Sequence, residues 1–194
     1  EIARQLACES AVLLKNDGIL PLAPDAQVAV IGTLAEQMRF QGGGSSHINT
    51  ARTPNALAAL RGLGVNAAYA PGYSLRDEEN PALEEQALAL ASGEKTVLFF
   101  GGLTDQYEGE GYDRGSLSMP ENQLRLLNRI CDVNPNVVFV SVSGAPYDMA
   151  FEGRVRGILQ MYLGGEAADE ACAALVTGRV NPSGKLAESW PCLL

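Results

Sequence analysis

Short apolar runs separated by amphipathic segments constrain the fold of this chain more than any other feature of its sequence. The runs lie at residues 28–32, 65–70, 96–100, 136–142 and 155–163, and each has the length and composition of a strand buried on both faces. Segments with helical spacing of apolar residues begin near residues 54, 81, 120 and 166. Buried strands that alternate with helices predict a mostly parallel sheet covered on both faces.

The predicted fold class is therefore α/β, a three-layer α/β/α sandwich with a mostly parallel sheet of about six strands. At 194 residues the chain is large enough for one substantial core, so we expect residues 1–194 to form a single domain. Residues 2–16 have the pattern of an amphipathic helix, and residues 185–190 that of a final antiparallel edge strand. Ser118 and Glu121 have capping-box spacing at the start of the helix near residue 120.

Composition excludes several classes of function. The formal net charge of −9 argues against nucleic acid, because phosphate neutralisation needs clustered Lys and Arg. No apolar run approaches the roughly 20 residues that cross a bilayer, so we expect no membrane partner. The four Cys are scattered at Cys8, Cys131, Cys172 and Cys192, which supports neither a zinc site nor a disulfide framework. We therefore expect no cofactor and buried thiols, which slightly favour a cytoplasmic location.

The sequence gives little support to a nucleotide-binding loop or to a Ser-His catalytic site at the carboxyl ends of these strands. Gly32 and the triple glycine at 42–44 are too far apart for a dinucleotide fingerprint, and no Gly-Lys-Ser/Thr follows, which argues against a flavodoxin-like nucleotide domain. Ser143 lacks the Gly-x-Ser-x-Gly pattern of a nucleophile elbow, and His47 is the only histidine that could activate it. A Ser-His hydrolase is therefore unsupported.

Residues 107–114, Tyr-Glu-Gly-Glu-Gly-Tyr-Asp-Arg, follow the third apolar run and form the strongest candidate site. Glycines on both sides of Glu110 indicate either an unusual backbone path or close approach of a ligand. Pairing of Arg114 with Asp113 would leave Glu110 free to titrate, and a raised pKa would suit general acid/base catalysis. From these residues alone, a solvated acidic loop is an equally good interpretation.

Five segments in the right order resemble the C-terminal α/β domain of glycoside hydrolase family 3, the family of many β-glucosidases and β-xylosidases. The segments are residues 9–16 with 20–22, the run 28–32, the glycine loop 42–46, the glutamate loop 108–114 with Leu117, Pro120 and Gln123, and the closing residues 181–186 with 190–191. The resemblance extends over nearly the whole chain. It implies an α/β sandwich that takes part in the hydrolysis of a β-linked glycoside or oligosaccharide.

The resemblance also implies roles for the charged residues of the glutamate loop. The family places its acid/base glutamate directly before the Gly-Tyr-Asp-Arg run, which makes Glu110 the expected catalyst and Glu108 the less favoured alternative. Asp113 and Arg114 are expected to support the loop. Family members of this type retain configuration, with a carboxylate nucleophile and a second carboxyl group that protonates the leaving oxygen and later activates water. No metal is implied.

One departure from the family pattern limits what this chain is expected to do alone. The nucleophilic aspartate of the family lies on an N-terminal barrel domain, and residues 1–194 contain no such barrel. Since the chain does not begin with Met, we expect further sequence upstream of Glu1. The predicted function is therefore the C-terminal domain of a retaining β-glycosidase, inactive by itself and partnered by the barrel. The alternative is a non-catalytic carbohydrate-binding or structural α/β module.

Overall fold

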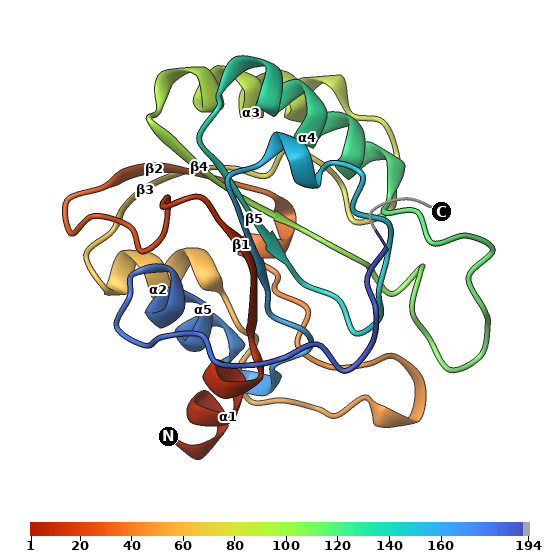
Figure 1. The fold of residues 1–194 in the computed structure, drawn as a ribbon. Coiled ribbons are helices and arrows are strands. Elements are labelled where there is room, and N and C mark those ends of the chain that lie inside the picture. Colours follow the sequence, from red (N-terminus) through yellow and green to blue (C-terminus); the bar gives the residue numbers. More distant parts are fainter. Residues whose placement is uncertain (192–194) are drawn as a thin grey trace.

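A six-stranded sheet lies between two layers of helices in the computed structural model, which describes residues 1–191 (Figure 1). The strands are β1 (Val12–Asn16), β2 (Gln27–Ile31), β3 (Asn66–Ala70), β4 (Thr96–Gly101), β5 (Val137–Ser141) and β6 (Gly157–Gln160). The α-helices of this part of the chain are α1 (Ile2–Ser10), α2 (Ala56–Gly62), α3 (Pro81–Gly93), α4 (Glu121–Val133) and α5 (Ala168–Val176). Helices α1, α2 and α5 cover one face of the sheet, and α3 and α4 cover the other.

The strand order is β1-β6-β5-β4-β2-β3, in which β2 to β6 run parallel and β1 runs antiparallel to β6. The prediction of an α/β sandwich with a mostly parallel sheet and one antiparallel edge is confirmed. Each of the five predicted apolar runs holds one of the parallel strands. Because helices cover both faces, the central strands bury side chains on both sides, which explains why their sequences are continuously apolar.

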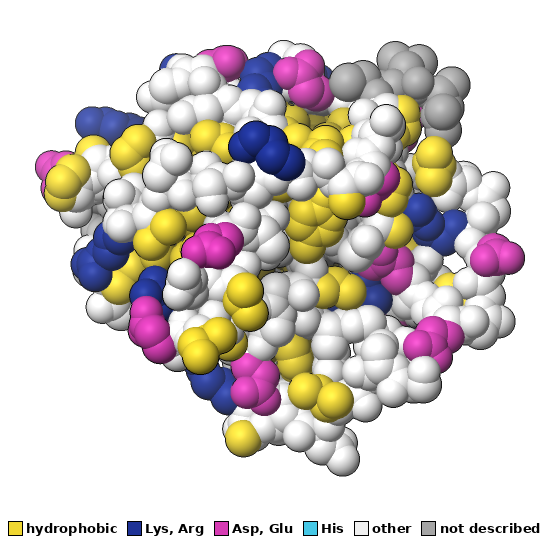
Figure 2. All heavy atoms as spheres, turned by 60° about the horizontal axis from the view of Figure 1, so that its bottom comes forward, with side chains coloured by type: hydrophobic (Ala, Val, Ile, Leu, Met, Phe, Trp, Pro, Cys, Tyr) yellow, Lys and Arg dark blue, Asp and Glu magenta, His cyan; other side chains and the backbone are white. Residues whose placement is uncertain are grey.

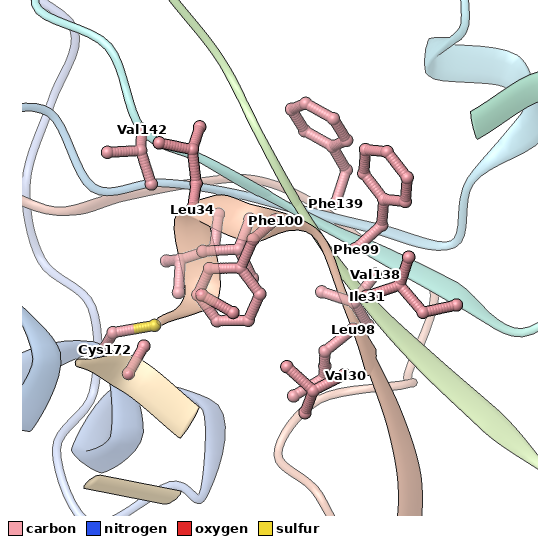
Figure 3. Packing of buried hydrophobic residues seen from close by; sticks show 14 of the residues in the cluster. Val30, Ile31, Leu34, Leu98, Phe99, Phe100, Val138, Phe139, Val142 and Cys172 are labelled. Carbon is pink, nitrogen blue, oxygen red and sulfur yellow. The ribbon is translucent and has the colours of Figure 1, made fainter. Parts of the chain in front are cut away.

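Aromatic and branched side chains of β2, β4 and β5 fill the core (Figure 3). Phe99 of β4 is paired in register with Phe139 of β5, and their rings stack with centroids 5.8 Å apart. Phe100 points to the opposite side of the sheet, toward Cys172 of α5 (Figure 3). All four side chains are fully buried, so the positions where β4 and β5 end are rigidly fixed.

Residues 2–16 do not form the single helix that the sequence predicted. Helix α1 ends at Ser10, Ala11 is extended with φ −66° and ψ 140°, and the remainder forms β1. Val12 pairs with Gln160 of β6, so the backbone hydrogen bonds of this segment are made across the sheet edge. Pairing with a distant strand has overridden a local pattern that is compatible with either helix or strand.

The antiparallel edge strand was predicted in the wrong segment. Residues 185–190 form no strand, because β1 already occupies the open edge of β6. The closing segment instead runs over the domain surface, where the N–H of Gly184 donates to the carbonyl of Ala11 at 3.1 Å. Trp190 then packs edge-on against Tyr147, with ring centroids 5.1 Å apart. Side-chain packing therefore holds this segment in place.

Charged side chains are dispersed over the face shown in Figure 2, where the Lys and Arg residues lie apart from one another among apolar and acidic groups. No helix in the described part of the chain is long and apolar enough to cross a membrane. Cys8 and Cys172 are buried and Cys131 is half-buried, whereas Cys192 lies outside the described residues. Burial raises the pKa of the Cys131 thiol to about 11 and suppresses its reactive thiolate form.

Glu84 of α3 fixes this helix against α4. Its side chain is 7% exposed, and its two oxygens accept hydrogen bonds from Arg125 Nη2 at 2.5 Å and from Arg129 Nη1 at 2.8 Å. Burial alone would raise the pKa of this carboxyl, but the hydrogen bonds from the two guanidinium groups hold the pKa below its usual value.

We expect the substitution Glu84→Gln to lower the free energy of unfolding by about 1–3 kcal/mol at neutral pH, as hydrogen bonds to charged groups contribute that much. The lowered pKa means that this stabilisation is present above the unfolded-state pKa and is lost as pH falls through the folded-state value. Denaturant unfolding at neutral and acid pH measures both effects.

The matched control for this experiment is Glu85→Gln. Glu85 also pairs with Arg129, at 2.7 Å, but its side chain is 68% exposed, so we expect a change of only about 0–1 kcal/mol. Equal losses in the two variants, or a Glu84→Gln effect that persists at acid pH, would contradict the assignment.

Candidate active site

The loops after β2 and β4 leave the sheet at its topological switch point. The chain passes from β2 to β3 on one side and then returns to form β4 on the other side of β2. In open α/β sheets, a crevice for ligands forms outside the carboxyl ends of the strands at such a point. Residues 32–55 follow β2 and residues 102–120 follow β4. The predicted catalytic loop therefore lies beside the glycine loop.

Glu110 stands at the tip of a short hairpin within the loop after β4. Gly109 and Tyr112 form an isolated antiparallel bridge, and the Tyr112 hydroxyl donates to the carbonyl of Asp105. A Cβ atom on Gly109 would lie 2.7 Å from the Tyr112 ring, so glycine lets the ring pack directly against this turn. Close packing inside the loop thus explains the glycine before Glu110, and the tip leaves the carboxylate exposed.

The glycine loop holds the carboxylate of Glu110. The N–H of Ser45 donates to Oε2 at 2.8 Å, and the Ser45 hydroxyl lies 2.8 Å from Oε1 and 2.6 Å from Oε2. Gly44 has a φ of +85°, and a Cβ atom at this position would lie 2.7 Å from Oε2 of Glu110. The carboxylate therefore rests on a turn in the left-handed backbone region, which favours glycine.

Hydrogen bonds from Ser45, first through its hydroxyl and then through its N–H, lower the pKa of the Glu110 carboxyl below its usual value. The raised pKa that would suit general acid/base catalysis is therefore not produced by these contacts. Because Glu110 is exposed, desolvation is too small to offset bonds that favour the charged form. Covering the carboxyl from water or placing a second carboxylate beside it would move its pKa upward.

Glu108, the less favoured candidate, points into the domain. Its side chain is 12% exposed and forms an ion pair with Arg39, which follows β2. Its Oε2 atom also accepts a hydrogen bond at 3.1 Å from the N–H of Gly144, which follows β5. Glu108 thus connects three loops at the carboxyl edge of the sheet, whereas Glu110 faces outward.

Arg39 is a site residue that sequence reasoning missed. Its Nε atom lies 2.8 Å from Oδ1 of Asp105, and its Nη2 atom lies 3.3 Å from the carbonyl oxygen of Glu108. The only signal in the sequence was a charged residue between Met38 and Phe40 shortly after a buried strand. Such a residue is ordinarily read as a solvated one, yet the Arg39 side chain is only 8% exposed.

Asp113 and Arg114 do not form the ion pair that the sequence suggested. The structure places Asp113 in an exposed position, and Arg114 Nη2 donates to the carbonyl oxygen of Pro146 at 2.8 Å. The N–H of Asp148 donates to the carbonyl of Leu117 at 2.7 Å in the same region. Arg114 therefore supports the loop by binding the segment after β5, and not by neutralising Asp113.

Asp77, from the segment after β3, fixes the far side of the glutamate loop. It accepts hydrogen bonds from the Tyr107 hydroxyl and, at 3.3 and 2.8 Å, from the N–H groups of Glu121 and Asn122 in the first turn of α4. The expected capping box of Ser118 and Glu121 is therefore wrong. A side chain from another segment satisfies the free N–H groups at the helix start.

Two hollows flank Arg39 and Gly42. A shallow one of about 260 Å³ includes Glu108, Glu110, Gly144 and Leu163 in its lining. The other, of about 450 Å³, lies toward the segments after β3 and β4, with an apolar lining that includes Leu34, Met38, Phe40 and Leu75. Glu110 therefore borders open space on the side that faces away from the core.

The alternative Ser-His arrangement does not assemble. Ser143 is fully buried, and its hydroxyl lies 3.4 Å from Nε2 of Gln160. His47 is exposed, and its Nδ1 atom lies 3.2 Å from Nε2 of Gln41. Among residues 1–191, no group of three or more His, Cys, Asp or Glu side chains is placed to hold a metal ion. Glu110 is the candidate whose carboxylate is exposed at the shallow hollow.

Residues 11–193 match the model of the glycosyl hydrolase family 3 C-terminal domain. The chain belongs to this family, and the resemblance seen in its sequence motifs is confirmed.

Three relatives illustrate the similarity. Thermostable beta-glucosidase B of Acetivibrio thermocellus is 42% identical over 201 residues, which cover 100% of this chain and 26% of that protein. An exo-alpha-(1->6)-L-arabinopyranosidase of Bifidobacterium longum is 42% identical over 203 residues, with coverages of 98% and 27%. The crystal structure of a Bifidobacterium adolescentis GH3 beta-glucosidase has a TM-score of 0.93 and 42% identity, covering 98% of this chain and 28% of that one. The chain thus spans about a quarter of the length of these relatives.

We expect Ser45→Ala to raise the pKa of Glu110 toward its ordinary value, because the variant loses the hydroxyl donor that contributes most to the lowering. A carbon-13 NMR titration of the side-chain carboxyls in the isolated domain measures this shift. Ser46→Ala serves as the control, since the Ser46 hydroxyl donates to the carbonyl of Gly43 rather than to Glu110. An unchanged pKa in Ser45→Ala would show that the contact does not persist in solution.

Proposed function

We propose that this domain supplies the general acid/base carboxyl group, that of Glu110, to a retaining β-glycosidase that releases terminal non-reducing β-D-glycosyl residues. The observation that carries the proposal is an exposed carboxylate on an anchored hairpin tip, at the switch point of the sheet. Glu108 is engaged with Arg39 and Gly144, so Glu110 is the one of the two glutamates whose carboxyl is free to reach a substrate.

The second carboxylate of the mechanism is proposed to lie on an N-terminal barrel domain of the complete protein. In a retaining glycosidase, this carboxylate attacks the anomeric carbon and forms a glycosyl-enzyme ester, while the acid donates its proton to the departing glycosidic oxygen. The same group, now a carboxylate, then removes a proton from the water that breaks the ester. Glu110 would perform both proton transfers.

The lowered pKa of Glu110 in the isolated domain fits this division of the site. A general acid must hold its proton near the working pH, which Ser45 opposes when the domain stands alone. A docked barrel and a bound sugar would exclude water from Glu110 and place the nucleophilic carboxylate about 5 Å away. Both changes raise the pKa of a carboxyl group. We therefore expect that Glu110 becomes a competent acid only in the assembled site.

The preferred sugar is a separate part of the proposal. A β-glucosidase and an α-L-arabinopyranosidase stand at the same 42% identity to this chain, so identity over this domain does not select between their substrates. Since the chain covers about a quarter of each relative, residues outside it are expected to contribute to the sugar pocket. We favour a β-D-glucoside and would compare it with the β-D-xyloside and α-L-arabinopyranoside in the complete enzyme.

In the complete enzyme, we expect Glu110→Gln to lower kcat/KM for a phenyl glycoside of the preferred sugar by about 10²–10⁴-fold, because this leaving group needs a proton. The loss of kcat/KM for the 2,4-dinitrophenyl glycoside should be small, since 2,4-dinitrophenolate departs unprotonated. With this activated substrate kcat should fall, because water attacks the glycosyl-enzyme without its general base, and azide should restore kcat because it needs no general base. The control is Asp25→Asn, which removes an exposed carboxylate from the segment before β2. This variant should behave as wild type. Equal losses on both substrates without azide rescue would contradict the role of Glu110.

We expect the isolated domain of residues 1–194 to release no phenol from aryl glycosides above the buffer rate, because it supplies one of the two carboxyl groups. Release of 4-nitrophenol from 4-nitrophenyl β-D-glucoside by the purified domain measures this. Sustained turnover that disappears in Glu110→Ala would contradict the idea of a half-site. If the complete enzyme is indifferent to Glu110→Gln, the non-catalytic module becomes the better account.

A further inference from the structure

Arg39 contacts the loop after β4 at three of its residues. Its Nη1 atom pairs with the carboxylate of Glu108 and lies 3.5 Å from the carbonyl oxygen of Leu103. Its Nε atom lies 2.8 Å from Asp105, and its Nη2 atom lies 3.3 Å from the main-chain oxygen of Glu108. One planar guanidinium group therefore holds both the start of the loop and the residue two positions before Glu110.

The segment that carries Arg39 is itself fixed from two directions. The N–H of Met38 donates to the carbonyl of Pro54 at 3.3 Å, and the Met38 side chain is buried. The carbonyl of Phe40 accepts a hydrogen bond at 3.0 Å from the N–H of Gly165, which follows β6. Arg39 thus projects from a rigid support, as a residue must if it is to set the position of another group.

Glu108 completes the connection on the opposite side. Both members of the ion pair are largely withdrawn from solvent, at 8% for Arg39 and 12% for Glu108. The carboxylate of Glu108 also accepts from the N–H of Gly144, so the loops after β2, β4 and β5 meet at this one group. Two nearly buried charges in such a place restrict motion, because separating them leaves each uncompensated.

We propose that Arg39 and Glu108 are positioning residues that set where the Glu110 carboxyl group stands. The inference rests on the proposed function, since it assigns to Glu110 the proton transfer that the pair would align. Only Gly109 separates Glu108 from Glu110. The glycine loop approaches the same turn, since a Cβ atom added to Gly43 would lie 3.4 Å from the carbonyl oxygen of Glu108. The segment after β2 therefore holds the hairpin at two points, through Arg39 at its base and Ser45 at its tip.

The proposal makes Arg39 act through Glu110, which a double-variant comparison in the complete enzyme tests. Arg39→Lys retains the positive charge but loses the fork that reaches several acceptors at once. We expect it to lower kcat/KM for the phenyl glycoside about 10- to 100-fold, because a misplacement of about 1 Å has effects of that size. The kcat/KM for the 2,4-dinitrophenyl glycoside, whose leaving group needs no proton, should stay near the wild-type value.

The decisive measurement is the same substitution in a Glu110→Gln background. If Arg39 acts through Glu110, Arg39→Lys should cause no further loss once the carboxyl is gone. The same loss in both backgrounds, or an equal loss on both substrates, would mean that Arg39 merely supports the fold and would overturn the proposal. An Arg39→Lys enzyme with wild-type kinetics would overturn it as well.

Three further variants keep the test decisive if Arg39→Lys folds poorly. Glu108→Gln preserves the shape of the side chain and an acceptor for Gly144, and we expect the same dependence on the leaving group with a smaller amplitude. Asp25→Asn changes an exposed carboxylate before the amino end of β2, whereas Arg39 follows its carboxyl end, and it should leave kinetics unchanged. Arg125→Lys, which changes another arginine that bridges two carboxylates, should lower thermal stability without a leaving-group effect.

The failure of this inference is distinguishable from the failure of the proposed function. If Glu110→Gln itself shows no dependence on the leaving group, the catalytic role of Glu110 is wrong and the positioning role falls with it. If Glu110→Gln shows the expected dependence and neither Arg39→Lys nor Glu108→Gln does, only the positioning role is wrong.

Discussion

The parallel pairing of β2 with β4 is the constraint on which the rest of the site depends. Val28 to Ile31 lie in register with Thr96 to Phe99, so both strands end at the same level of the sheet. The loops that follow must then start side by side, although they are more than 60 residues apart in the chain. Because these strands are buried on both faces, the starting points of the loops cannot shift without disturbing the core.

From those starting points the two glutamates acquire opposite roles. The carboxylate of Glu108 turns inward and joins three loops through Arg39 and Gly144. The carboxylate of Glu110 turns outward at the hairpin tip and contacts Ser45. The same chemical group thus serves as an anchor at one position and as an exposed, titratable group two residues later. Burial and hydrogen-bond partners account for the difference.

Much of the fold follows from the sequence, because buried parallel strands are continuously apolar and the helices between them are amphipathic. All five parallel strands were predicted within a few residues, and so was the placement of the candidate loop after β4. The edge was misassigned because residues 12–16 satisfy a helical pattern as well as an extended one, and only the free edge of β6 decides between them.

The contacts that hold the site were beyond the reach of sequence patterns. Arg39 to Glu108, Ser45 to Glu110 and Asp77 to α4 each join segments from different strand ends. Periodicity predicts which segments form strands, but it does not give their order in the sheet. Without that order, Arg39 has the appearance of a solvated side chain and Ser118 that of a helix cap. The capping prediction at Ser118 failed and Arg39 was missed for the same reason.

The central claim is that this domain holds one carboxyl group of an active site that closes around a sugar. The most direct test is the structure of the complete enzyme with the sugar trapped as its covalent glycosyl-enzyme. We expect the Glu110 carboxyl to lie about 5–5.5 Å from the carboxyl that bears the sugar, on the side of the departing oxygen. A Glu110 that remains turned away from the sugar, with another carboxyl at that distance, would contradict it.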